Sequence, residues 1–283
     1  MRVLYVLGLN RSGSTVFERA LGSIGGVFAA GEVHNLFLWP GLSRECGCGE
    51  RVRDCPTWSA IFRCVEAAYG HEIDEFVLRV AQLQQRTGRT RHLGKILRGA
   101  PEARELAGLL HMFYEAIASA TGATVITDSS KSPAGALLLR LMQTDFTVVD
   151  LRRDPLATVQ SNTTIRRWDN VAPASAPPEI SGGRLAGTQA TVTLAAQVLR
   201  KHVVPVSFEA FLDDPATATS ALPFDTTELK TIDTLARTHQ CEGNPARFGD
   251  ATLSPYEAHG RGNPNAATRL EAAAIAVLRR LSR

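Results

Sequence analysis

The sequence predicts an α/β fold, a P-loop-like three-layer sandwich in which a central parallel sheet is flanked by helices. Residues 3–7 form a short, continuous apolar run, which is typical of a strand buried on both faces of a parallel sheet. A glycine-rich turn over residues 8–13 follows, and apolar residues then recur on one face of a helix that begins at Ser14. Further apolar runs, each followed by polar residues, predict more core strands at 123–127, 146–151 and 203–208.

At 283 residues, the chain is long enough to bury a large core in one domain with insertions. We therefore expect a single domain over residues 1–283, with a mainly helical insertion at about 59–120. A polar, basic stretch at 86–92 interrupts that insertion. The insertion and a loop rich in Pro, Ala, Ser and Gly at 173–183 are expected to shape a ligand site. A last helix, rich in Ala, Leu and Arg, is expected at 266–283.

Composition narrows the choice of partners and location. The net charge of +3 suits an anionic ligand, but it is too weak to indicate nucleic acid. No apolar run approaches the roughly 18–20 residues that span a bilayer, and no cleavage site follows the short apolar start, so we expect neither a membrane anchor nor a signal peptide. Five cysteines without a regular framework favour the cytoplasm. Abundant Ala and Arg with scarce Lys are typical of bacterial coding.

The first strand, turn and helix together predict an anion-binding site. The N–H groups in the first turn of a helix are unpaired, and the helix dipole favours negative charge there. Gly8 and Gly13 have the spacing of a Walker loop, but Ser14 stands where that motif has the lysine that reaches the β- and γ-phosphates. The sequence therefore argues against ordinary ATP or GTP chemistry. The basic group of this loop is Arg11 instead.

The run Arg11-Ser12-Gly13-Ser14-Thr15 after a first strand resembles the 5′-phosphosulfate loop of sulfotransferases that use 3′-phosphoadenosine-5′-phosphosulfate (PAPS). The resemblance implies that these five residues bind the 5′-phosphate. It also implies that Arg11 contacts the bridging oxygen and the sulfuryl group. PAPS would then be the sulfuryl donor, and 3′-phosphoadenosine-5′-phosphate (PAP) the product.

A second element after the strand at 146–151 resembles the 3′-phosphate signature of the same family, Arg-[Asn/Asp]-Pro-x5-Ser. Arg153 precedes Asp-Pro, and Ser161 follows it at the required spacing of eight residues. Arginine supplies a rigid, forked donor suited to a phosphate. Arg152 is an alternative, although the Arg-Asp-Pro register favours Arg153. Near the end of the chain, Gly-Asn-Pro-x-Arg-Phe resembles an element of bacterial members, which assigns a 3′-phosphate role to Arg247.

Glu32 follows a short predicted strand at 25–30, and an acid just past a strand end lies on the ligand side of an open α/β sheet. The spacing from Arg11 to Glu32 and the Gly-Glu pair resemble the sulfotransferase branch that acts on protein tyrosines. There the glutamate takes the proton of the acceptor hydroxyl, a role that we carry to Glu32. His34 is the competing base, because cytosolic sulfotransferases of small phenols use a histidine.

Asp128-Ser129-Ser130-Lys131 lies at the end of the strand predicted at 123–127. A lysine that emerges from this strand end can point its ammonium group at the anion held by the first loop. The stretch resembles the sulfotransferase element whose lysine stabilises the transferring group and the leaving phosphate. This implies a catalytic role for Lys131.

Three cysteines, Cys46, Cys48 and Cys55, lie among Gly and Pro residues at 40–58. Three interpretations stay open: a structural zinc site, a disulfide such as Cys48–Cys55, or buried free thiols in a tight loop. The spacing lacks a clear second pair of ligands, and only Cys64 and His34 are candidates for a fourth. We therefore assign no metal ligand from the sequence.

Taken together, the resemblances predict a PAPS-dependent sulfotransferase that moves a sulfuryl group in line to the hydroxyl of a small molecule or carbohydrate. Glu32 would take the acceptor proton, while Arg11, Lys131 and the N–H groups of residues 12–15 meet the developing charge, so that no metal is required. Two alternatives remain: a small-molecule or nucleotide kinase, and a non-catalytic nucleotide-binding or zinc-stabilised interaction protein. The acceptor's identity and the oligomeric state are left open.

Overall fold

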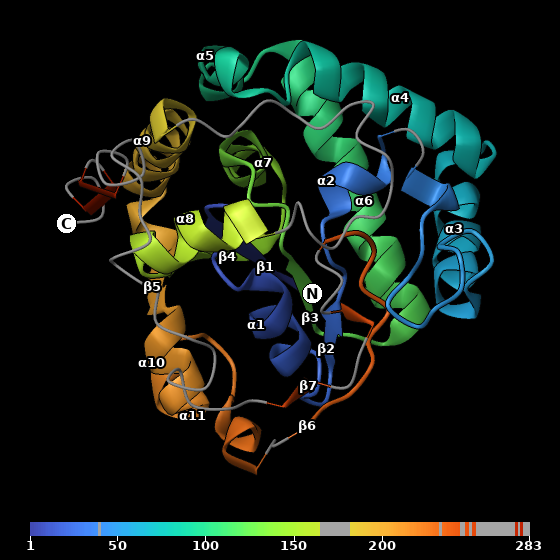
Figure 1. The fold of residues 1–283 in the computed structure, drawn as a ribbon. Helices are drawn as coiled ribbons and strands as arrows, with labels where there is room; N and C mark the ends of the chain where they lie inside the picture. The colour runs from blue at the N-terminus through green and yellow to red at the C-terminus, as the bar shows by residue number, and fades with distance from the viewer. Residues whose placement is uncertain are drawn as a thin grey trace.

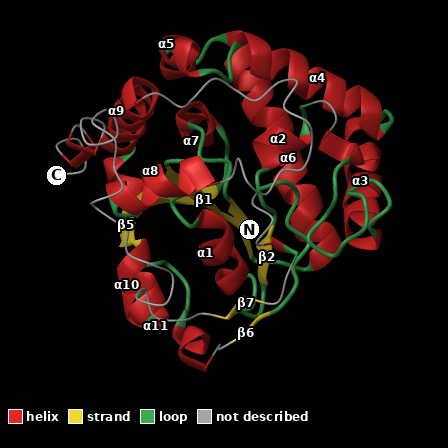
Figure 2. Ribbon diagram, viewed as in Figure 1, coloured by secondary structure: helices red, strands yellow, loops and turns green. Residues whose placement is uncertain are grey.

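The computed structural model describes residues 1–38, 41–164, 182–231, 234–243, 247–248, 251–252, 275–276 and 278–279. Its centre is a five-stranded parallel sheet in the order β2-β3-β1-β4-β5 (Figures 1 and 2). The strands are β1 (Arg2–Gly8), β2 (Val27–Ala29), β3 (Val125–Asp128), β4 (Asp145–Arg152) and β5 (Val203–Ser207). All five strands were predicted from the apolar runs, and the α/β fold with a central parallel sheet is confirmed.

Alternate side chains of β1 point into two separate cores, as the period-two geometry of a strand requires. Val3, Tyr5 and Leu7 lie in one core, and Leu4 and Val6 lie in the other. The first core packs against α3 (Pro56–Tyr69), α4 (Ile73–Arg86), α6 (Pro101–Thr121), α7 (Pro133–Leu138) and α9 (Gly182–Val198). The second packs against α1 (Ser14–Leu21), α10 (Phe208–Asp213) and α11 (Pro215–Thr219). The sheet is therefore the middle of three layers.

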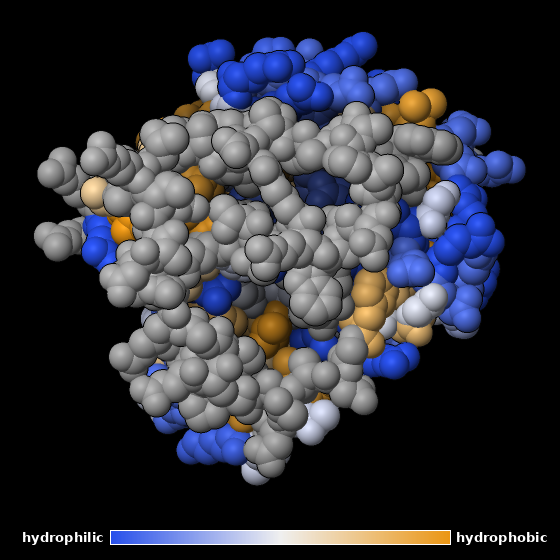
Figure 3. All heavy atoms as spheres, in the orientation of Figure 1, coloured by the Kyte–Doolittle hydropathy of each residue, from blue (hydrophilic) through white to orange (hydrophobic). Residues whose placement is uncertain are grey.

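The helical insertion predicted at 59–120 is formed by α3, α4, α5 (Leu93–Leu97) and α6. Pro56 and Pro101 occupy first-turn positions of α3 and α6, where a missing N–H costs nothing. Trp58 is fully buried and stacks on Phe62 and Phe113, which joins α3 to α6. Figure 3 shows mostly hydrophilic residues on the outer face of the insertion. The insertion thus enlarges the core on one side of the sheet, because its buried side chains and those of β1 belong to one cluster.

A segment near the end of the chain, residues 238–243, runs against β2 and the start of α2 (Val33–Leu36). Cys241 donates its N–H to the Ala30 carbonyl and accepts from the Glu32 N–H, both at 2.9 Å. Gly31 must be a glycine here: its φ is +85°, and a Cβ would lie 2.1 Å from the Cys241 carbonyl oxygen. The 238–243 segment therefore covers the edge of the sheet at β2 and is fixed to the backbone of Glu32.

The other described elements are α8 (Pro155–Thr164) and a small antiparallel pair, β6 (Thr234–Leu235) and β7 (Ala251–Thr252). The loop predicted at 173–183 lies almost wholly outside the described residues, as does most of the helix predicted at 266–283. Within the described part of the chain, no helix is both long and apolar enough to cross a bilayer.

Candidate active site

The loop between β1 and α1 has backbone conformations that few residues adopt. Gly13 has a φ of 90°, and a Cβ there would lie 2.3 Å from the Phe208 ring. Arg11 also has a positive φ, 70°, which is uncommon outside glycine and recurs at functional sites. Among the described residues, the buried hydroxyl oxygen of Ser12 has no hydrogen-bond partner. Together with the N–H groups of the first turn of α1, these features form a cradle suited to an anion.

Arg11, Arg153 and Ser161 meet beside this loop, although they are far apart in sequence. Arg11 Nε donates to Ser161 Oγ at 3.0 Å, and Arg153 Nη1 donates to the Arg11 carbonyl oxygen at 3.0 Å. Burial lowers the pKa of Arg11, and the adjacent charge of Arg153 lowers it further. Two like charges held this close favour binding of a negatively charged group between them.

The two candidate arginines lie in different surroundings. Arg152 faces Asp150, with its Nη2 2.7 Å from the carboxylate Oδ2. Arg153 instead contacts the loop, and its guanidinium lies 5.4 Å from the centroid of the Phe208 ring. Arg153, the arginine in the Arg-Asp-Pro register, thus contacts the anion cradle directly, and its 3′-phosphate role stays a prediction.

Lys131 joins the loop to Glu32. Its Nζ lies 3.2 Å from Ser14 Oγ and 2.5 Å from Glu32 Oε1, and it also donates to the Ser129 carbonyl at 2.8 Å. The second oxygen of Glu32 accepts from Asn35 Nδ2 at 2.6 Å. Lys131 has a positive φ, 58°, and is buried. The predicted base and the predicted catalytic lysine are therefore an ion pair at the N-terminus of α1, where Thr15 is also buried.

Arg247 lies on the Glu32 side of the site. Its Nη1 donates to the Gly243 carbonyl at 2.7 Å, and its guanidinium stacks on Phe248 at 4.0 Å. Burial lowers the pKa of Arg247, while the nearby Glu242 and Glu32 act in the opposite direction. The predicted 3′-phosphate role of Arg247 stays a prediction.

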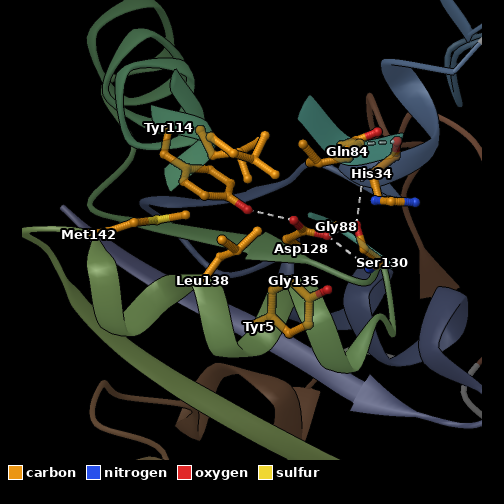
Figure 4. A pocket seen from close by; sticks show the side chains of 13 residues that line it. Tyr5, His34, Gln84, Gly88, Tyr114, Asp128, Ser130, Gly135, Leu138 and Met142 are labelled. Carbon is orange, nitrogen blue, oxygen red and sulfur yellow. Dashed lines mark hydrogen bonds between the residues drawn. The ribbon is translucent and has the colours of Figure 1, made fainter. Parts of the chain in front are cut away.

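A pocket lies between the helical insertion, α7 and the strands β1 and β3 (Figure 4). His34, the competing base, lines it at one side, and Met142 lies at the other. Burial lowers the pKa of His34, and the neighbouring Glu32 partly offsets this, so the imidazole is neutral near pH 7. The apolar lining residues are Val33, Leu106, Leu110, Leu138 and Met142.

The polar groups of the pocket centre on Asp128. Tyr114 donates its hydroxyl to Asp128 Oδ2 at 2.6 Å, and the Ser130 N–H donates to Oδ1 at 2.8 Å. Burial raises the pKa of Asp128 and that of Tyr114. Gln84 donates to the His34 carbonyl at 3.4 Å, and among the described residues its buried Oε1 has no partner. The pocket thus offers one unused acceptor beside His34.

Glu18 was not expected from the sequence. It is fully buried on α1, and its carboxylate accepts four hydrogen bonds of 2.6–2.8 Å, from Gly31 N, Thr127 Oγ1, Ser129 Oγ and Gln240 Nε2. Burial raises the pKa of Glu18 to about 7, although each of these hydrogen bonds lowers it. Of these partners, Gly31 directly precedes Glu32, Ser129 lies two residues before Lys131, and Gln240 belongs to the 238–243 segment. Glu18 therefore holds together the three backbone segments that surround the Glu32–Lys131 pair.

Three of the cysteines lie beside a histidine that the sequence analysis did not name. The four side chains that lie together are Cys46, Cys48, Cys55 and His239, and neither candidate for a fourth ligand, Cys64 or His34, belongs to this group. The sulfurs of Cys48 and Cys55 are 3.7 Å apart, and all five cysteines are free thiols. His239 is far from these cysteines in the sequence. Its position two residues before Cys241 is the one local feature that could have suggested it as a partner of the cysteines.

Fold and site together define an α/β protein whose first loop, between β1 and α1, forms a cradle suited to an anion. A family model described as the sulfotransferase family matches residues 4–223, and the chain belongs to that family. The sulfotransferase domain from the curacin biosynthetic pathway is similar in structure, with a TM-score of 0.56 and 15% identity over 99% of this chain and 97% of that one. The sulfotransferase domain from the Synechococcus PCC 7002 olefin synthase gives a TM-score of 0.49 and 17% identity, over 100% and 95%.

At these identities, the curacin-pathway domain shows a shared fold alone. A search of curated proteins found no match. Family membership supports the sulfotransferase class over the kinase alternative. The absence of the Walker lysine already argued against a kinase.

Proposed function

We propose that this protein transfers a sulfuryl group from PAPS to an acceptor hydroxyl, with Glu32 as the general base. The observation that carries the proposal is the position of Lys131. Its Nζ contacts both Ser14 Oγ at the anion loop and Glu32 Oε1. One ammonium group therefore lies between the place where a donor phosphate would bind and the carboxylate that would take the acceptor proton.

The residues at the loop fit the donor. The cradle at 11–15 suits a 5′-phosphate, because it combines helix N–H groups with the unpartnered Ser12 oxygen. Arg153 and Ser161 lie next to it and would hold a 3′-phosphate. PAPS supplies a sulfuryl group whose bond to the bridging phosphate oxygen breaks as the bond to the acceptor oxygen forms. Arg11 and Lys131 would stabilise the charge that then collects on the phosphate oxygen.

Glu32 would receive the acceptor proton on its Oε1 or Oε2. Both oxygens are engaged, by Lys131 and Asn35, so the carboxylate is held in place before an acceptor arrives. When Lys131 turns toward the developing phosphate charge, Glu32 Oε1 becomes available to the hydroxyl. A base that is already oriented within hydrogen-bond reach is the requirement for general base catalysis.

The pocket beside His34 would hold the acceptor. Its lining combines the five apolar side chains named above with the rings of Tyr5 and Tyr114, which favours an acceptor with an apolar body, such as a phenol or a natural-product alcohol, over a carbohydrate. The unpartnered Gln84 Oε1 would accept a hydrogen bond from a polar group of that acceptor. Because Leu106 and Leu110 belong to α6, the helical insertion would set the acceptor's shape.

The test is a comparison of Glu32→Gln with His34→Gln. Formation of PAP from PAPS reports transfer to any acceptor, and calorimetry with PAP reports donor binding separately. We expect Glu32→Gln to lower turnover by about 10²–10⁴-fold, the range of general base catalysis, with PAP affinity unchanged. His34→Gln should retain most of the turnover. The reverse pattern would make His34 the base, and full activity in both variants would refute acid–base catalysis at this position.

A further inference from the structure

We propose that Cys46, Cys48, Cys55 and His239 bind one Zn²⁺ ion in a closed structural site. The ion would fasten the 238–243 segment, which contacts Glu32, to the loop that precedes α3. This site is separate from the anion cradle, and its existence does not depend on the proposed sulfuryl transfer.

Three of the distances among the four donor atoms are close to those of a zinc tetrahedron. With Zn–S of about 2.3 Å and Zn–N of about 2.0 Å, tetrahedral geometry puts two sulfurs about 3.8 Å apart and a sulfur and a nitrogen about 3.5 Å apart. The sulfurs of Cys48 and Cys55 are 3.7 Å apart, and His239 Nδ1 lies 3.3 Å from Cys55 Sγ and 3.8 Å from Cys46 Sγ. All four atoms lie within 4.8 Å of one another. A disulfide would need sulfurs about 2.05 Å apart.

The backbone holds the three cysteines in this arrangement. The N–H of Cys46 donates to the Glu50 carbonyl at 2.7 Å, and the Gly49 N–H donates back to the Cys46 carbonyl at 2.9 Å. This tight turn places Cys46 and Cys48 on one side of the cluster. Cys55 is the N-cap residue of α3, so its position is fixed by a helix that is packed in the core.

His239 is oriented from outside the cluster. Its Nε2 lies 3.2 Å from Thr57 Oγ1, and its backbone carbonyl accepts from Trp58 Nε1 at 2.7 Å. A hydrogen bond at one ring nitrogen that directs the other toward the ligands is the usual support of a metal-binding histidine. Both supporting residues belong to the first turn of α3, directly after Cys55.

The donor set selects the metal and the role. Three thiolates and one imidazole in a tetrahedron are typical of zinc, and four protein ligands leave no position for a substrate or water. Each cysteine gives up its thiol proton to the solvent when the metal binds, and no electron transfer is involved. The site is therefore expected to stabilise structure rather than to take part in the reaction.

The ion would act on Glu32 through the 238–243 segment. Besides His239, this segment contributes Gln240, whose carbonyl accepts from Gly47 N at 3.0 Å and whose side chain donates to Glu18 at 2.8 Å. Cys241 then binds the Glu32 N–H through its carbonyl. Zinc would fix the position of His239, and the segment that follows it would in turn hold the backbone of Glu32, the proposed base.

The experiment is metal analysis of the purified full-length chain by mass spectrometry. We expect about one zinc per chain, as a four-ligand site requires. Cys48→Ser should lose most of this zinc, whereas Cys64→Ser should keep it, since Cys64 is also half-buried but lies outside the cluster. A chelator should lower the melting temperature of the wild type and of Cys64→Ser alike.

Two further measurements keep the proposal refutable if Cys48→Ser fails to fold. The wild type, refolded with Co²⁺, should show the visible absorption of tetrahedral cobalt bound to thiolates. Absence of that spectrum, or a wild-type protein without zinc whose five thiols all react, would overturn the site in favour of free thiols. A peptide linking Cys48 to Cys55 and two missing hydrogens in the intact mass would overturn it in favour of a disulfide.

Discussion

The buried carboxyl group of Glu18 makes a prediction about how stability depends on pH. Its pKa is raised to about 7 in the folded protein by burial, against an ordinary value of 4.5. The folded state therefore binds this proton more tightly than the unfolded state does. The resulting stabilisation is fully present below pH 4.5 and is lost as pH rises through 7.

The size of the effect follows from the two pKa values. One pKa unit corresponds to about 1.4 kcal/mol, so the complete change is about 3 kcal/mol, of which about 2–3 kcal/mol falls between pH 5 and 8. Glu18→Gln cannot ionise, and its amide can still donate to the Ser129 hydroxyl and accept from Gly31 N. We expect this variant to fold, and we expect its unfolding free energy to lack the decrease between pH 5 and 8 that Glu18 causes.

The assay is urea unfolding of the wild type, Glu18→Gln and Glu50→Gln at pH 5, 6, 7 and 8. Glu50 is an exposed glutamate, which makes it a matched control for removing one negative charge. The unfolding free energy of the wild type relative to Glu18→Gln should drop by about 2–3 kcal/mol across this range, because the other titrating groups cancel in the difference. Equal pH dependence in all three proteins would refute the assignment of a raised pKa to Glu18.

Two further predictions concern the anion cradle. Arg153→Ala should weaken PAP binding by roughly 10- to 100-fold, the value of a hydrogen bond to a charged group, whereas Arg152→Ala should change it little. Calorimetry of both variants checks this, and equal losses would contradict the assignment of Arg153. Gly13→Ala should destabilise the fold by about 1–3 kcal/mol and abolish PAP binding, because its Cβ would collide with Phe208 at a φ of +90°. Urea unfolding with and without PAP measures both effects, and a variant with wild-type stability would show that the loop is more adaptable than this packing indicates.

The strands and the anion cradle could be predicted because their signals are local. Short apolar runs marked the five strands, and parallel strands bring their carboxyl ends to one edge of the sheet. Arg11, Lys131 and Arg153 each follow such a run within a few residues, and the structure brings all three to that edge. The break within the helical insertion was likewise visible as a polar, basic stretch.

The parts that were missed depend on contacts between distant segments. Glu18 looks like an ordinary helix residue in the sequence, and only its partners at 31, 127, 129 and 240 make it a buried anchor. The same holds for His239, which reaches the cysteines because the 238–243 segment returns to β2. No local pattern encodes either approach. For the pocket around Tyr114 and Asp128, the sequence predicted only that the helical insertion would shape a ligand site, and it named none of the lining residues of the insertion.

The measurement that tests the central claim most directly is thermal stabilisation by PAP, with ADP and ATP as controls. A ligand that binds only the folded state raises the melting temperature by mass action. The proposed 3′-phosphate site at Arg153 and Ser161 predicts a clear rise with PAP and little with ADP. An equal rise with ADP or ATP would contradict that site and favour the kinase alternative, and no rise with PAP would contradict donor binding altogether.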